Sequence, residues 1–290
     1  MYASQFSQQS NLIYRLGTLL ILMGFTTALC FCIPGLAQDA EKPAADVEEE
    51  TEEPGEAPRS EIPEEGEYAW RPLFDGKTLE GWMSPGFGGG AEPRIEDGAI
   101  VIPAGVDVAG IRHQKGEEFP KVNYEIELDA LRDNGVDFFA TTTFPYKDEC
   151  CSLVIGGWGG MVIGISCVDG YDASENETVQ WMQLKDKVWY HIRIRVSEDK
   201  IEAWVNELDE DDEPIKNEHI IKRNGNGDER VVNLITNERR ISTRIEVDLC
   251  RPFGIATWCT EGHIRNIQMR NLPESEVEAI TEEAKASIWW

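Results

Sequence analysis

Apolar and polar residues alternate in short runs through the middle of the chain. The run 124–130 has an apolar residue at every second position and an acidic residue at each position between them. The same two-residue period recurs at 189–196 and at 201–206. Such a period predicts β-strands with one buried face and one solvent-exposed face, as in antiparallel sheets. Antiparallel pairing of the last two runs would set Arg193 or Arg195 opposite Glu202.

Other short runs separated by turn residues extend this pattern along the chain. They predict strands at 73–74, 94–96, 99–102, 111–115, 136–144, 153–155, 161–168, 245–249, 253–258 and 264–272, with 217–244 irregular. Strands do not alternate with helices as in a parallel sheet, so the pattern predicts an all-β sandwich. A helix is expected at 274–287, with its apolar stripe packed on the sandwich.

The first 68 residues have a different composition from the rest. Residues 16–33 are apolar and follow Arg15, and small residues precede Gln38, which predicts a signal peptide at 1–37. A retained membrane anchor is the alternative. Residues 38–68 are rich in Glu and Pro and predict an acidic linker. The sandwich would then occupy 69–273 and the C-terminal helix 274–290. Export predicts a secreted, periplasmic or cell-envelope protein, with possible contact to the envelope.

Charge and cysteines narrow the function classes. The net charge of -27 argues against binding to nucleic acid, whose phosphates require Lys and Arg. Five cysteines follow the signal region, and an exported protein can oxidise them. Cys250 and Cys259 flank one predicted strand and could join its ends, whereas Cys150 or Cys151 could pair with Cys167; inert thiols are the alternative. The histidines are scattered and there is no C-x-x-C, so no metal site is predicted.

One stretch carries a resemblance to a known family. Leu73-Phe74-Asp75-Gly76-Lys77-Thr78-Leu79-Glu80-Gly81-Trp82 resembles the opening LF(N/D)GK-x-L-x-GW of the DUF1080, or 3-keto-disaccharide hydrolase, domain. The segments 95–100, 189–194 and 264–272 are similar to later blocks of that family, in the same order. The resemblance implies a concanavalin A-like jelly roll that acts on or binds carbohydrate. It also implies that the first and last strands lie side by side.

The implied chemistry needs a base. A 3-keto sugar has an acidified hydrogen at C2, and a base that removes it lets the glycosidic oxygen leave by elimination. The candidate bases are Asp137, Asp169 and His263, of which Asp169 matches the family's acid, while the Tyr-Glu pair expected before it is absent. Arg193 is a candidate for binding the enolate. Each of these residues could instead be a surface charge or half of an ion pair.

Aromatic residues add candidate sugar contacts. Trp158 lies among four glycines, and Trp181 lies in a polar region; exposed tryptophans stack on sugar faces. The sequence therefore favours an exported hydrolase-type protein that cleaves 3-keto-disaccharides or related glycosides. The alternatives are a non-catalytic carbohydrate-binding or envelope module and a membrane-tethered structural protein. No cofactor is certain, and a divalent metal is a possible one.

Overall fold

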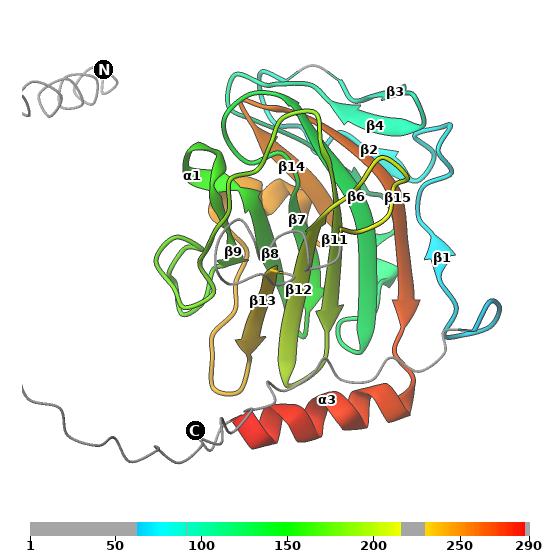
Figure 1. Cartoon of the computed structure of the whole chain (residues 1–290), viewed down its shortest axis with the longest axis vertical. Helices are drawn as coiled ribbons and strands as arrows, with labels where there is room; N and C mark the ends of the chain where they lie inside the picture. Colours follow the sequence, from blue (N-terminus) through cyan, green and yellow to red (C-terminus); the bar gives the residue numbers. More distant parts are fainter. Residues whose placement is uncertain (1–62, 91, 216–229, 288–290) are drawn as a thin grey trace, which may run out of the picture. The chain divides into compact units, whose positions relative to one another are not determined.

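The computed structural model describes residues 63–90, 92–215 and 230–287, which form two antiparallel sheets packed face to face (Figure 1). Sheet A contains, in spatial order, β13 (Arg230–Ile235), β12 (Lys200–Glu207), β11 (Trp189–Val196), β6 (Tyr124–Asn134), β15 (Glu261–Asn271), β4 (Ala99–Ile102) and β3 (Arg94–Glu96), and β1 (Arg71–Pro72) also pairs with β15. Sheet B contains β10 (Gln180–Trp181), β9 (Val162–Ser166), β8 (Glu149–Gly156), β7 (Thr141–Tyr146), β14 (Gly254–Trp258), β5 (Val108–His113) and β2 (Trp82–Met83). Among the described residues, the short helical elements are η1 (Gly116–Glu118), α1 (Gly157–Gly160) and η3 (Ile245–Cys250), and α3 (Glu274–Ser287) is a longer helix. The predicted β-sandwich and its C-terminal helix are confirmed.

The core lies between the sheets and follows the alternation of the sequence. Every second residue of the segment 124–130 of β6 and of β11 is fully buried in one apolar cluster: Tyr124, Ile126, Leu128, Ala130, Tyr190, Ile192, Ile194 and Val196. The first and last strands lie side by side, because Arg71 pairs with Met269. Burial of so many β-branched and aromatic side chains is the main source of stability in such a fold.

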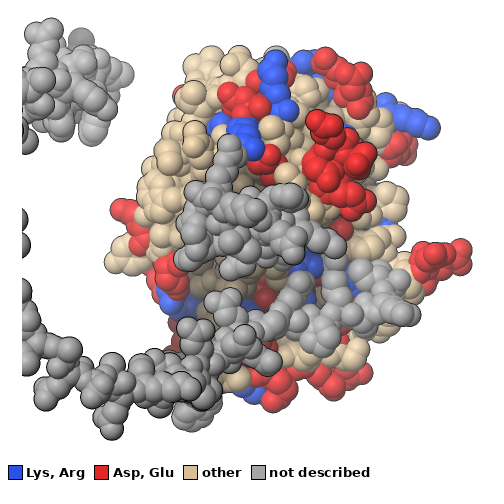
Figure 2. Space-filling view, viewed as in Figure 1, with Lys and Arg blue, Asp and Glu red and all other residues tan. Residues whose placement is uncertain are grey.

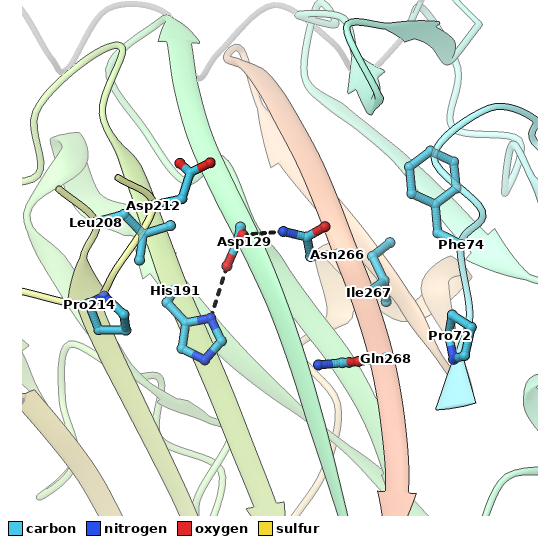
Figure 3. A pocket seen from close by; sticks show the side chains of 10 residues that line it. All are labelled: Pro72, Phe74, Asp129, His191, Leu208, Asp212, Pro214, Asn266, Ile267 and Gln268. Carbon is cyan, nitrogen blue, oxygen red and sulfur yellow. Dashed lines mark hydrogen bonds and ion pairs between the residues drawn. The ribbon is translucent and has the colours of Figure 1, made fainter. Parts of the chain in front are cut away.

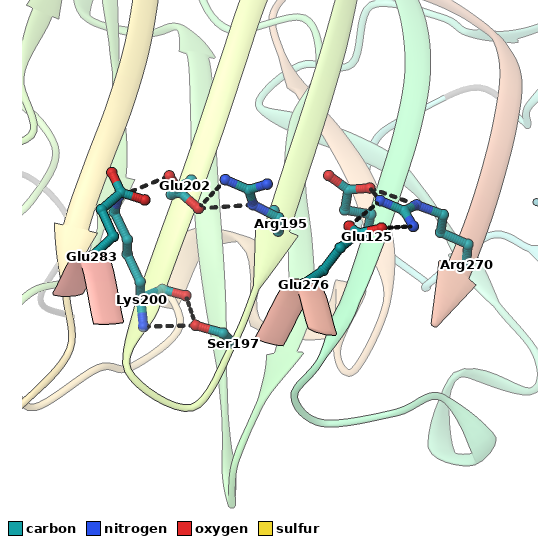
Figure 4. A network of polar contacts seen from close by, with 8 residues as sticks. All are labelled: Glu125, Arg195, Ser197, Lys200, Glu202, Arg270, Glu276 and Glu283. Carbon is teal, nitrogen blue, oxygen red and sulfur yellow. Dashed lines mark hydrogen bonds and ion pairs between the residues drawn. The ribbon is translucent and has the colours of Figure 1, made fainter. Parts of the chain in front are cut away.

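The outer face of sheet A differs from the expectation of a solvent-exposed face. Glu125, Arg195, Glu202 and Arg270 point to this face, yet each is at most 4% exposed. Figure 4 shows how their charges pair across neighbouring strands. Arg195 Nε donates to Glu202 Oε2 at 2.8 Å, as the predicted register required. Pairing replaces hydration here, so charged residues are buried without being isolated.

Helix α3 closes one end of this face. Its Glu276 accepts from Arg270 at 2.7 and 3.1 Å, and its Glu283 accepts from Lys200 Nζ at 3.0 Å (Figure 4). Ile280 is fully buried with Leu272 beneath it. The helix therefore packs on the sandwich, as its apolar stripe predicted, and ion pairs at both ends fix its position across the strands (Figure 1).

The outer face of sheet B is filled by loops of the same chain. Its strands carry small residues there, and a Cβ added at Gly110 would lie 3.3 Å from the Sγ of Cys250 in η3. From the loop after β9, the Asn176 amide donates to the carbonyl of Ile165 at 2.8 Å. Val247 and Cys250 are buried against this face. On sheet A, by contrast, a cavity forms on the outer face.

Several local predictions are wrong. The strand predicted at 136–144 is β7, which covers only 141–146, so residues 136–140 lie before it. Residues 245–249 form a 3-10 helix rather than the predicted strand. Residues 230–235, expected to be irregular, form β13, and β1 covers 71–72 rather than 73–74. All five described cysteines are free, so neither disulfide is present. The ends of one extended strand lie too far apart for a disulfide to join them.

The sequence predictions for 1–62, for the part of the irregular segment up to residue 229 and for the helix end at 288–290 lie outside the described residues. Within the described part of the chain, no helix combines the length and the apolar character needed to cross a membrane. Figure 2 shows acidic side chains in larger patches than basic ones on the described part of one face.

Candidate functional site

A cavity of about 460 Å³ lies on the outer face of sheet A, near the pairing of β1 with β15. Figure 3 shows its lining side chains from β6, β11, β15, the β1 segment and the loop after β12. They are Pro72, Phe74, Asp129, His191, Leu208, Asp212, Pro214, Asn266, Ile267 and Gln268. This volume falls in the range of small-molecule sites, and its lining mixes apolar and polar groups as such sites do.

Asp129 is the centre of the polar wall. Its Oδ1 lies 2.9 Å from His191 Nδ1, and its Oδ2 accepts from Asn266 Nδ2 at 2.7 Å (Figure 3). Arg265 Nε lies 3.5 Å from the same Oδ2. The three partners surround one carboxylate whose side chain is only 6% exposed. Cross-strand pairing produces the arrangement, because Asp129 lies opposite both His191 and Arg265.

A bulge in β15 adds Asn266 to this wall. The register shifts between Arg265 and Gln268, so two residues of β15 stand where β6 has one. Asn266 has a φ of 53°, which Asn tolerates better than most residues. As a result, Arg265 and Asn266 both reach the outer face, while Ile267 turns into the core with 1% exposure.

The His191 imidazole is charged at neutral pH. Burial is the largest single influence on its pKa and lowers it, but Asp129 and Glu127 together outweigh burial and raise the pKa from 6.5 to about 9. The His191 side chain keeps 25% exposure, so it remains accessible from the cavity. A protonated imidazole in a partly apolar cavity is a proton donor and a stabiliser of a developing oxyanion.

A second carboxylate lies at the rim of the cavity. Asp212, on the loop after β12, accepts from Arg265 Nη2 at 2.6 Å and keeps 59% exposure. The Arg265 guanidinium also stacks 4.1 Å from the Trp189 ring centroid. Among the described residues that line the cavity, only Asp129, His191 and Asp212 carry ionisable side chains. Of the two carboxylates, that of Asp212 is the more accessible to a ligand.

Asp169, a predicted base, lies away from this cavity. It occupies an exposed turn, where the Arg240 backbone N–H and the Arg239 guanidinium hold it at 2.8 and 2.7 Å. These contacts, led by the Arg240 amide, lower the pKa of Asp169. Both carboxylate oxygens of Asp169 are thus bonded and the residue lies outside the cavity lining, so the geometry favours a structural ion pair at this position.

Asp137 and Trp158 are brought together, although they are 21 positions apart in the sequence. Asp137 Oδ2 accepts from the backbone N–H of Gly159 at 3.2 Å, and its Oδ1 accepts from Phe138 N at 2.8 Å. The Trp158 ring lies 4.8 Å from the Arg244 guanidinium and is 40% exposed. Asp137 thus holds the glycine turn that carries Trp158, and neither residue lines the cavity.

The other predicted residues also lie outside the cavity. Trp181 is 57% exposed on the short edge strand β10 of sheet B. Arg193 is 7% exposed and stacks 3.7 Å from the Trp204 ring, so it is covered rather than open to a substrate. His263 lies on β15, 3.3 Å from Glu261 Oε1. Sequence reasoning therefore missed Asp129, His191 and Asp212, whose only signal was their polar position in alternating strands and in an acidic loop.

Comparison with known proteins identifies the domain. Residues 69–210 match the family model described as a 3-keto-alpha-glucoside-1,2-lyase-like domain. This segment belongs to that family. The match confirms the family that the opening motif indicated. The lyase-like domain therefore belongs to a carbohydrate-active domain family. Beyond the matched residues, β13, β14 and β15 complete the same two sheets. None of the curated proteins matches the sequence.

The solved structures that match this chain have low identity and low TM-scores. A carbohydrate-binding module, CBM66, from Bacillus subtilis has a TM-score of 0.36 and 11% identity, over 66% of this chain and 96% of its own. Domain 4 of the extracellular arabinanase AbnA from Geobacillus stearothermophilus has a TM-score of 0.36 and 16% identity, over 68% of this chain and 84% of its own. A glycosyl hydrolase family protein from Mycobacterium fortuitum has a TM-score of 0.36 and 9% identity, over 70% of this chain and 99% of its own.

Proposed function

We propose that the lyase-like domain cleaves a 3-keto-glycoside by elimination across C1 and C2, in the cavity on sheet A. The observation that carries the proposal is the charged His191 beside Asp129 in a cavity of about 460 Å³. The family supports the reaction type, and the cavity volume suits a small sugar.

The reaction needs a base, an oxyanion stabiliser and a proton for the leaving group. A base removes the proton from C2, and the C–H electron pair delocalises onto the C3 carbonyl oxygen as an enolate. The enolate then collapses, the bond from C1 to the glycosidic oxygen breaks, and that oxygen takes the proton that the base had removed from C2. The products are a 1,2-unsaturated 3-keto sugar and the free alcohol. Water can add to the double bond afterwards, which completes a net hydrolysis.

Three side chains of the cavity suit these roles. His191 carries the proton and the positive charge that stabilise the enolate. Asp129 keeps His191 charged and oriented through the 2.9 Å contact. Asp212 is the remaining carboxylate of the described lining, and its exposed oxygens make it the base. Asn266 and Gln268 supply amide groups for sugar hydroxyls.

The experiment compares 3-keto-glycosides with their unoxidised parents, using the full chain. Cleavage of the keto forms alone is expected, with a primary isotope effect when C2 carries deuterium. Asp212→Asn should reduce kcat by about 100-fold or more. Asp211→Asn is the matched control, because it removes the same charge from the neighbouring exposed position of the same loop. Absence of cleavage by the wild-type protein would refute the function, and equal rates for the two variants would refute only the role of Asp212.

A second candidate function rests on the exposed tryptophans. Trp158 and Trp181 are 40% and 57% exposed, and large exposed aromatic side chains commonly mark binding surfaces. Binding of unmodified sugars without cleavage, lost on Trp158→Ala or Trp181→Ala and retained in Asp212→Asn, would favour a non-catalytic carbohydrate-binding module.

Export is part of the proposal. The apolar segment 16–33 and the small residues before Gln38 support a signal peptide that is removed after residue 37. Mass spectrometry of the protein recovered from its native host tests this directly. A mature N-terminus at Gln38 is expected, and a chain that begins at Met1 in the membrane fraction would indicate a retained anchor.

A further inference from the structure

A cluster of three potential metal ligands lies on sheet A, outside the cavity lining. One ligand atom from each of Asp133, Glu261 and His263 lies within 4.8 Å of the other two. Asp133 is near the end of β6, and Glu261 and His263 are at the start of β15. The residues are far apart in the sequence, and only the pairing of β6 with β15 brings them together.

The register explains why all three side chains face the same side. His263 lies opposite Leu131, and Asp133 is two residues beyond Leu131 on the same strand, so both point to the outer face. Glu261 is two residues before His263 on β15, so it faces the same side, and the register shift between Glu261 and Gly262 leaves Asp133 of β6 without a paired residue on β15. Two carboxylates and one imidazole thus converge from two neighbouring strands rather than from a loose loop.

The contacts that the cluster already makes are weak and replaceable. Arg94 lies 3.4 Å from Glu261 but has a closer partner in Glu96, at 3.0 Å. Lys187 lies 3.7 Å from Asp133 and is 73% exposed, so water can solvate it alone. Releasing Glu261 and Asp133 from these cations therefore leaves no buried charge without a partner, and the cost is that of surface ion pairs.

We propose that Asp133, Glu261 and His263 bind a divalent first-row transition ion. Two carboxylates supply two negative charges, which a divalent cation neutralises, and an imidazole nitrogen favours a transition metal over Ca²⁺ or Mg²⁺. Metal–ligand bonds of about 2.1 Å require the ligand atoms to approach to about 3.4 Å. Side chains that are 18 to 37% exposed can make that movement by rotation. The remaining coordination positions would take water or a sugar hydroxyl.

This site is distinct from the proposed catalytic groups but close to them along the sheet. His263 is two residues from Arg265 on β15, and Arg265 contacts the Asp129 and Asp212 carboxylates. The proposal of a metal site rests on the cluster alone and does not require that the domain cleaves glycosides.

The test uses Mn²⁺, which favours carboxylate ligands and has little affinity for the chain's thiols. Mn²⁺ is titrated into the metal-stripped full chain, and binding is followed by electron paramagnetic resonance. One saturable site with a hyperfine coupling to an imidazole nitrogen is expected. The nitrogen signature separates this site from ions held by the acidic segment 38–68, which offers only oxygen ligands.

Variants make the result decisive. His263→Gln should abolish the nitrogen coupling and weaken binding by about tenfold or more, and Glu261→Gln should weaken it similarly. Glu96→Gln is the matched control, because it removes a carboxylate that shares Arg94 with Glu261 but lies outside the cluster. A wild-type spectrum without nitrogen coupling, or coupling that persists in His263→Gln, would overturn the proposal and leave the cluster as ion pairs only.

Discussion

The raised pKa of His191 leads to a quantitative prediction for the variant Asp129→Asn. In the folded protein the pKa of His191 rises from 6.5 to about 9, although burial opposes the rise. Asp129 contacts Nδ1 at 2.9 Å, and Glu127 lies 3.9 Å from Nε2. An opposite charge at such a distance changes a pKa by about 1 to 3 units. Asp129→Asn should therefore lower the pKa of His191 by at least about one unit.

Nuclear magnetic resonance measures this pKa directly, because the chain has only four histidines. The Cε1 proton of His191, assigned by its loss in His191→Gln, should titrate near pH 9 in the wild type. Asp169→Asn is the control, since that carboxylate pairs with Arg239 and lies outside the cavity lining. A wild-type midpoint below about pH 7, or the same midpoint in Asp129→Asn, would refute the account of the charged imidazole.

The same shift has a consequence for stability. A rise from 6.5 to about 9, at about 1.4 kcal/mol per unit, corresponds to about 3 kcal/mol. Because the folded-state pKa is the higher one, this stabilisation is fully present below pH 6.5 and is lost as the pH rises through 9. Urea unfolding of wild type and His191→Gln should therefore differ by about 3 kcal/mol more at pH 6 than at pH 10. The proposed activity should decline over the same pH range, as His191 loses its proton.

Three further predictions concern the frame around the site. Arg270→Met should lower the free energy of unfolding in urea by about 3 to 5 kcal/mol, because Glu125 and Glu276 both lose the fully buried Arg270 guanidinium as a partner. An equal stability of Arg270→Met and wild type would contradict this. Gly254→Ala should lower the melting temperature, since its Cβ would overlap backbone of β5, whereas Gly88→Ala, which meets open space, should not. In the folded protein a thiol reagent should modify the exposed Cys259 much faster than the buried cysteines, and mass spectrometry of peptides measures the rates. Comparable rates at all cysteines would show that the other thiols are not buried.

The sequence predicted much of the frame because the relevant signals are local. Alternation along β6 and β11 assigned their inward faces, and the bounds of β11 and α3 agree with the predicted ones. The opening motif at 73–82 led to the family that the matched segment belongs to. The prediction of a strand at 245–249 failed because a short run that contains apolar residues is compatible with a short helix as well as with a strand. Packing of Val247 and Cys250 against sheet B selects the helix.

The candidate site depended on tertiary structure. His191 and Asn266 meet Asp129 across sequence separations of 62 and 137 residues, and each contact requires the order β11–β6–β15 in sheet A. Sequence alternation determined that these side chains face outward, but not which strands are neighbours or that β15 carries a bulge. It also gave no sign that loops fill the outer face of sheet B. Local periodicity thus determined the faces of the strands, whereas the pairing of distant strands, which no local signal encodes, decided where charge and cavity coincide.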